Sequence, residues 1–94
     1  MSSNALPSFF RAAIFEARDP ELGYANAGYH LARHFDDQVE DDELEALAVA
    51  RAADDDESAV WAWIAVHLPR CAALIPRRRR ASFMKGVFQA LEEG

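Results

Sequence analysis

The clearest structural signal in the chain lies between Asp54 and Leu68, which read DDDESAVWAWIAVHL. The four acidic residues at its start are typical of a helix N-terminus, because carboxylates there accept hydrogen bonds from free backbone N–H groups. The apolar run from Ala59 to Val66 could also be a buried strand, but its three alanines favour a helix. Apolar side chains cover most of its circumference, so we expect this helix to be the central one.

Composition predicts that the rest of the chain is helical as well. Valine and isoleucine together number eight, threonine is absent, and alanine supplies 19 of the 94 residues. We therefore predict an all-α fold, a single small helical bundle of four to five helices in one domain over residues 1–94. The helices are expected at about 6–17, 20–35, 42–52, 56–68 and 76–92, with a short helical turn at about 69–74.

Local signals place two helix starts and one close contact. Asp19 before Pro20 predicts a helix start, since aspartate is a good cap and proline suits the first helical position. Asp42, followed three residues later by Glu45, has the spacing of a capping box. Gly28 lies on the predicted inner face of its helix, so we expect another helix to approach it closely.

Charge is strongly segregated along the chain, although the formal net charge is only −6. Residues 36–57 hold 11 acidic residues and one arginine, Arg51, whereas residues 69–94 hold six basic and two acidic residues. Arg77 to Arg80 fill the expected first turn of the last helix, where positive charge opposes the helix dipole. They pair with the acidic segment of the same chain, extend into solvent or meet an anionic partner.

Two pairs of residues four apart, one of two histidines and one of a histidine and a cysteine, are candidates for metal binding or catalysis. His30, His34 and Asp37 would share one side of a continuous helix and could offer ligands to zinc, but no fourth ligand is near in sequence. His67 and Cys71 could form a thiolate–imidazole pair, but Pro69 breaks the helical register between them. We expect a polar flank at the first pair and a buried, inert cysteine at the second.

The remaining catalytic signatures are missing. The sequence has no glycine-rich phosphate loop, no serine-centred nucleophile elbow and no CxxC pair. Trp61 and Trp63 diverge on a helix, which favours core packing over a platform for nucleic-acid bases. We therefore expect a protein that is not an enzyme, with no cofactor and no metal.

The cellular location of the protein is predicted from its apolar runs and its cysteine content. The longest apolar run has eight residues, whereas a bilayer needs about 20, and the single Cys71 has no disulfide partner in the chain. We expect no membrane association and a cytoplasmic protein. Its alanine and arginine content indicates a bacterial or phage genome.

Our first hypothesis is an acidic protein that acts through protein–protein interaction with a basic or nucleic-acid-binding partner. In size and charge the chain resembles phage-encoded inhibitors of bacterial defence, anti-CRISPR proteins included. That resemblance implies an inhibitor or regulator of nucleic-acid-handling machinery. The predicted acidic face consists of Asp36, Asp37, Glu40, Asp41, Asp42, Asp54, Asp55 and Asp56.

The alternative is nucleic-acid or anion binding through a basic cluster. This cluster consists of Arg70, Arg77, Arg78, Arg79, Arg80 and Lys85. A third hypothesis is metal binding through His30 and His34. Phe15 lies opposite the apolar stripe of the first helix. It is either packed by a neighbouring helix or exposed for a partner. In the second case the chain could form a homodimer.

Overall fold

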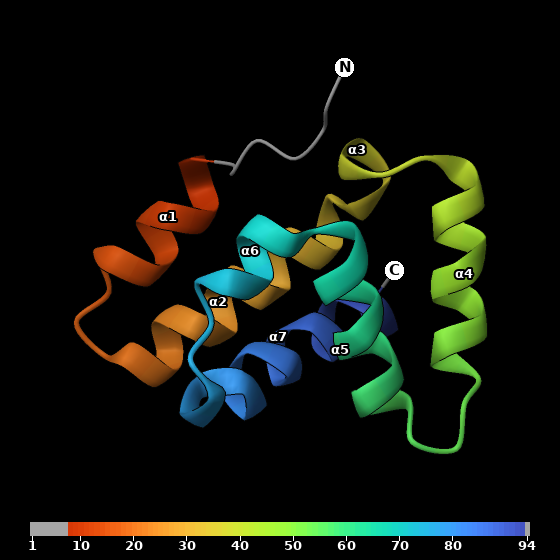
Figure 1. The fold of residues 1–94 in the computed structure, drawn as a ribbon. Coiled ribbons are helices and arrows are strands. Elements are labelled where there is room, and N and C mark those ends of the chain that lie inside the picture. The colour runs from red at the N-terminus through yellow and green to blue at the C-terminus, as the bar shows by residue number, and fades with distance from the viewer. Residues whose placement is uncertain (1–7, 94) are drawn as a thin grey trace.

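The computed structural model describes residues 8–93, and its fold is all-α (Figure 1). Its elements are α1 (Ser8–Phe15), α2 (Pro20–Arg33), α3 (Phe35–Gln38), α4 (Asp41–Arg51), α5 (Asp56–His67), α6 (Pro69–Ala73), the 3-10 helix η1 (Arg77–Arg79) and α7 (Arg80–Glu93). No strand occurs among residues 8–93, which confirms the predicted fold class. The seven α-helices found there exceed the four to five that were predicted. In this part of the chain, no helix has both the length and the apolar character that a membrane crossing requires.

The number of helices differs because two short helices, α3 and α6, occur beside the five predicted ones. His34, with φ −119° and ψ 21°, ends α2 and separates it from α3. The break lets the buried ring of Phe35 pack edge-on against Trp63, with ring centroids 5.0 Å apart. That contact joins residues far apart in sequence, so helical periodicity could not predict it. The predicted turn at 69–74 is present as α6.

The helix caps agree with the sequence at two positions and differ at a third. Asp19 accepts a hydrogen bond from the Glu21 N–H at 3.1 Å, and Asp55 accepts one from the Ser58 N–H at 3.3 Å. The prediction of Asp42 as a cap is wrong, because α4 begins one residue earlier, at Asp41. Its cap is Glu40, whose N–H donates to the Glu43 side chain at 2.8 Å.

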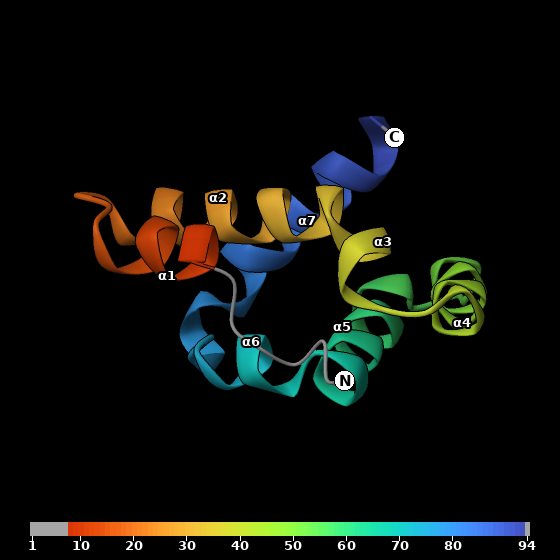
Figure 2. The same ribbon diagram turned by 90° about the horizontal axis from the view of Figure 1, so that it is seen from above.

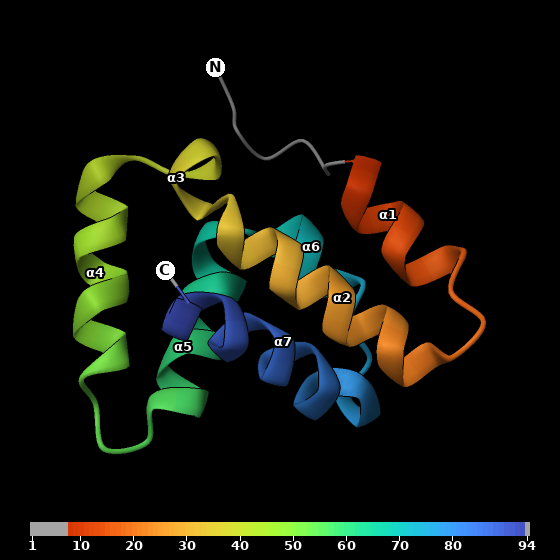
Figure 3. The same ribbon diagram turned by 180° about the vertical axis from the view of Figure 1, so that it is seen from behind.

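The most extensive helix contact joins α2 to α7, so α5 is not the central helix that we expected. The two helices cross with their backbones touching at Gly28 and Gly86 (Figure 3). A Cβ atom at Gly28 would overlap the Phe83 carbonyl, and one at Gly86 would overlap the Ala25 carbonyl. The close approach predicted at Gly28 is therefore confirmed.

Helices α1, α2 and α7 form one layer, and α5 and α6 lie against it as a second layer (Figure 2). The largest fully buried side chains come from both layers: Phe10, Leu31, Val60, Ile64, Phe83, Met84 and Val87. Helix α4 lies at the side of both layers (Figure 1), and its only buried residue is Leu47. The predicted acidic face lies around the two ends of this peripheral helix, mostly in the segments that flank it.

Candidate partner-binding surface

The predicted acidic face is divided between the two ends of α4. Asp36 and Asp37 lie in α3, beside Glu40, Asp41 and Asp42 at the start of α4. The other three residues, Asp54 to Asp56, lie in the connection from α4 to α5 and at the start of α5 (Figure 1). Since 11 residues of α-helix rise about 16 Å, α4 holds two acidic groups apart rather than one continuous face.

All eight carboxylates of the acidic face are exposed. Asp55 is partly occupied as the cap of α5, and Asp37 lies 3.4 Å from His34 Nδ1. Within residues 8–93, no lysine or arginine forms an ion pair with any of the eight. Their charge is therefore available to a partner.

Between these two acidic groups, the exposed side of α4 carries one charged side chain, Glu45, and is otherwise apolar around Val49. Val49 is 74% exposed, and the alanines around it are exposed as well: Ala46, Ala48, Ala52 and Ala53. Exposed valine and alanine contribute apolar contact area at little cost in side-chain entropy. The surface of α4 thus combines a largely apolar middle with negatively charged ends.

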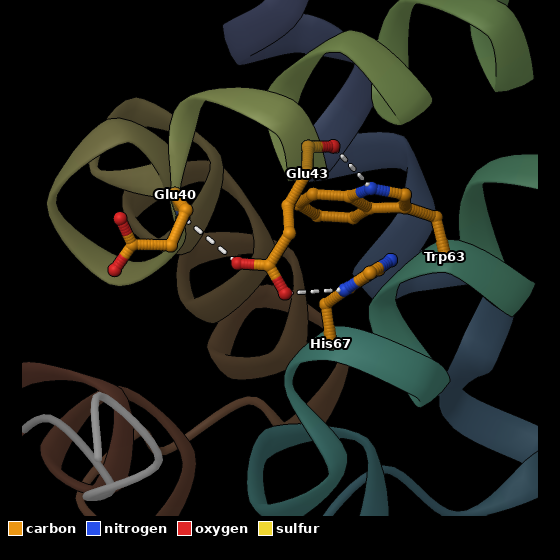
Figure 4. Close-up of polar contacts among 4 residues, drawn as sticks. All are labelled: Glu40, Glu43, Trp63 and His67. Carbon is orange, nitrogen blue, oxygen red and sulfur yellow. Dashed lines mark hydrogen bonds and ion pairs between the residues drawn. The ribbon is translucent and has the colours of Figure 1, made fainter. Parts of the chain in front are cut away.

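Glu43 makes three contacts, of which two join α4 to α5 and one caps the start of α4 (Figure 4). Its backbone carbonyl accepts a hydrogen bond from Trp63 Nε1 at 2.8 Å. One carboxylate oxygen accepts from the Glu40 N–H, and the other lies 2.7 Å from His67 Nδ1. Because a carboxylate only accepts, Nδ1 is the His67 nitrogen that carries the proton. The Glu40 N–H, and then His67, hold the pKa of the Glu43 carboxyl below its usual value.

We did not predict this role for Glu43. The usable signal was its position three residues after Glu40, which is the spacing of a capping box. Its partners Trp63 and His67 lie 20 and 24 residues further along the chain, beyond the reach of local patterns.

A groove of about 440 Å³ separates α4 from the C-terminal end of α7, and we call it the α4–α7 groove. Its apolar lining consists of Ala32, Phe35, Leu44, Leu47, Ala90 and Leu91. Four charged residues complete it: Arg33, Asp36, Arg51 and Glu93. The groove exists because α4 packs against α5 on one side and is not closed against α7 on the other.

The basic cluster is dispersed by the fold. Arg77, Arg78 and Arg79 form the 3-10 helix η1, which follows the extended Pro76 and runs directly into α7 at Arg80. Arg79 Nη1 lies 3.9 Å from Glu21, which belongs to α2 and not to the acidic segment. The pairing of the cluster with residues 36–57 that we considered is not found within residues 8–93.

Arg80 meets an aromatic ring instead of an anion. Its guanidinium lies 4.2 Å from the centre of the Trp61 ring, a cation–π contact, and its buried Nε has no hydrogen-bond partner. Trp61 packs edge-on against Phe83, and Trp63 is buried, as expected for core residues. Arg70, Arg77, Arg78 and Lys85 are exposed.

The surroundings of His30 and His34 do not suit metal binding, and those of Cys71 do not suit a nucleophilic cysteine. His30 and His34 pack against the ring of Phe9, with centroid distances of 6.3 and 5.4 Å. In the described part of the chain, no group of three or more potential ligands could hold a metal ion. Cys71 is 3% exposed, and desolvation raises the pKa of its thiol to about 11, whereas a nucleophilic cysteine needs a lowered pKa.

The alternative left open for Phe15 is decided within this chain. Phe15 is 63% exposed at the end of α1, and Arg11 lies over its ring at 5.9 Å. Among residues 8–93, no neighbouring helix covers it.

Comparison with known proteins gives no match: no family model, no curated protein and no solved structure is similar to this chain. The function is therefore argued from the chain's own residues.

Proposed function

We propose that the protein is a non-enzymatic interaction protein that presents α4, with its two acidic ends, to a basic protein partner. The observation that supports this most directly is the set of eight exposed carboxylates without a lysine or arginine partner among residues 8–93. They lie at both ends of an exposed, largely apolar helix side that contains Val49. Negative charge at both ends attracts and orients a basic surface, and the apolar middle supplies area to bury.

The proposed partner belongs to nucleic-acid-handling machinery, because the basic surfaces of such proteins are built to receive phosphates. Two groups of carboxylates held apart by one helix can occupy such a surface and keep nucleic acid out. The protein would then act as an inhibitor or regulator, as phage inhibitors of bacterial defence do. We place it in the cytoplasm, where a single free cysteine such as Cys71 stays reduced.

Paired charge variants test this proposal. The partner is captured from a bacterial lysate and identified by mass spectrometry, and its affinity is then measured at several salt concentrations. The double variants Asp41→Asn/Asp42→Asn and Asp54→Asn/Asp56→Asn each remove two charges from one end of α4. Each should weaken binding by about tenfold or more and reduce its dependence on salt.

The matched control is Glu16→Gln/Glu21→Gln, which removes two exposed charges beside the end of α1 and at the start of α2, away from the acidic face. It should change affinity little, because exposed charges far from an interface are screened by salt. If all three double variants weaken binding equally, only the total charge matters and α4 is not the binding surface.

An alternative function is favoured by one observation, the exposure of Arg77 and Arg78 without an ion-pair partner among the described residues. They could bind phosphate of a nucleic acid, together with Arg70 and Lys85. A band-shift assay at low salt should then retain DNA or RNA, and Arg77→Gln/Arg78→Gln should abolish the retention. The absence of any retained complex would remove this alternative.

A further inference from the structure

The α4–α7 groove leaves apolar side chains only partly covered. Glu43, Trp63 and His67 hold one side of α4 against α5, so Leu44 faces the groove on another side. Leu44 on α4 and Leu91 on α7 are both half-buried, and Ala90 is too small to fill the space between them. The C-terminal end of α7 faces α4 from the opposite side (Figure 3). A volume of about 440 Å³ is within the range of pockets that bind ligands.

The charges around the groove favour a basic occupant. Arg33 is already engaged, because its Nη1 lies 3.7 Å from Glu93 and donates to the Tyr29 hydroxyl. Arg51 is the remaining cation among the residues that line the groove. Against it stands Asp36, the lining carboxylate without a cation partner among the described residues, because Glu93 is engaged by Arg33 and Tyr29. The exposed carboxylates of Asp37, Asp41 and Asp42 extend the negative charge through α3 and the first turn of α4.

The walls of the groove are helices, and this favours a helical occupant over an extended peptide. An extended peptide would bring backbone N–H and C=O groups into an apolar groove that has no strand edge to pair with them. A helix satisfies its own backbone and offers apolar side chains at positions i, i+3, i+4 and i+7.

We propose that the α4–α7 groove binds a basic amphipathic helix of the partner, whose apolar side chains enter between Leu44 and Leu91. Lysine and arginine on the flanks of that helix lie over the carboxylates of α3 and of the start of α4. This inference rests on the proposed function and extends it, because it assigns the apolar anchor of the partner to a defined pocket. Interface anchors of this kind commonly carry most of the binding free energy.

The test uses two synthetic helical peptides of roughly 15 residues, one built from leucine and lysine and one with alanine at every leucine position. The two peptides have the same charge and differ only in the apolar face. Titration into the full chain, at roughly 50 and 300 mM salt, gives the dissociation constants. The leucine peptide should bind at least about tenfold more tightly than the alanine peptide. Amide NMR signals of Leu44, Ala90 and Leu91 should shift on its addition.

Variants of the protein locate the binding. Leu91→Gln and Leu44→Gln should each lower the affinity for the leucine peptide by about tenfold and leave the affinity for the alanine peptide unchanged. Val66→Gln is the matched control, since Val66 is 71% exposed on α5 and does not line the groove. Circular dichroism of every variant confirms that it is folded before binding is compared.

The outcomes separate the two proposals. Equal, salt-sensitive binding of both peptides would overturn the groove inference and leave the acidic surface supported. Tight binding of the leucine peptide that responds neither to salt nor to Asp41→Asn/Asp42→Asn would overturn the electrostatic recognition and support only the apolar groove. Binding of decanoate with loss of the leucine peptide would show that the occupant is an anionic amphiphile, which overturns the inference.

Discussion

The α2–α7 crossing and helix α4 are held in the fold by different means. At the crossing, two backbones touch at Gly28 and Gly86, and the side chains of Phe83 and Val87 are fully buried. In contrast, α4 buries only Leu47, exposes Val49 and depends on the polar contacts of Glu43. Apolar burial is the main source of folding free energy, so the stability of the molecule is concentrated at the crossing.

Because of this difference, we expect the α2–α7 crossing to maintain the stability of the fold and the outward side of α4 to be free for binding. A helix with few buried contacts can open locally at a small free-energy cost, while the crossing opens only when the whole domain unfolds. Residues on the outward side of α4 can therefore serve a partner without being needed by the core. Three changes test this division, and we give them from the largest expected effect to the smallest.

Gly86→Ala should lower the free energy of unfolding by about 3 kcal/mol, because the new Cβ would overlap the backbone of Ala25. Elsewhere in a helix, the same change stabilises by about 1 kcal/mol, so the sign itself is informative. Urea denaturation followed by circular dichroism measures the effect. Gln89→Ala, on the exposed side of the same helix, is the control and should stay within about 0.5 kcal/mol. A Gly86→Ala protein as stable as the parent would mean that the helices do not cross this closely.

Leu47→Ala should cost about 2 kcal/mol, since it removes the one buried side chain of α4. Its effect should be local, so amide hydrogen exchange should accelerate in α4 more than in α2 or α7. Val49→Ala, two residues along on the exposed side, should change stability by less than about 0.5 kcal/mol. Uniform acceleration across all helices would show that α4 is part of the cooperative core.

Glu43→Gln should have the smallest effect and a characteristic pH dependence. The pKa of the Glu43 carboxyl is lowered in the folded protein from its usual 4.5, chiefly by the Glu40 N–H and also by His67. Its contribution to stability is therefore complete above pH 4.5 and is lost as pH falls through the lowered pKa. Below pH 4.5, unfolding free energy should fall less steeply in Glu43→Gln than in the parent.

Glu45→Gln removes the same charge from the exposed side of α4 and is the control for that measurement. It should retain the steep acid branch of the parent. Identical acid branches in the parent and in Glu43→Gln would show that neither the Glu40 N–H nor His67 favours the charged Glu43 carboxylate in the folded protein.

Local signals explain which parts of the fold could be predicted. Asp19, Pro20 and Asp55 act on neighbouring residues, so their roles as helix starts were readable from the sequence. The break at His34 was not readable, because it accompanies the contact between Phe35 and Trp63, which lie far apart in sequence. Sequence spacing treated Arg77 to Arg80 as one group, while the fold places Arg79 beside Glu21 and Arg80 over Trp61.

Some features of the candidate site could likewise be predicted from the sequence, and others only from the tertiary structure. Charge segregation between residues 36–57 and 69–94, and the helical class, follow from composition and short-range spacing alone. Only the tertiary structure decided that α4 holds the carboxylates in two groups, that Glu43 is engaged by His67 and that an apolar groove separates α4 from α7. The physical reason is distance along the chain: helix caps and periodicity act over about four residues, whereas the groove and its charges join helices dozens of residues apart.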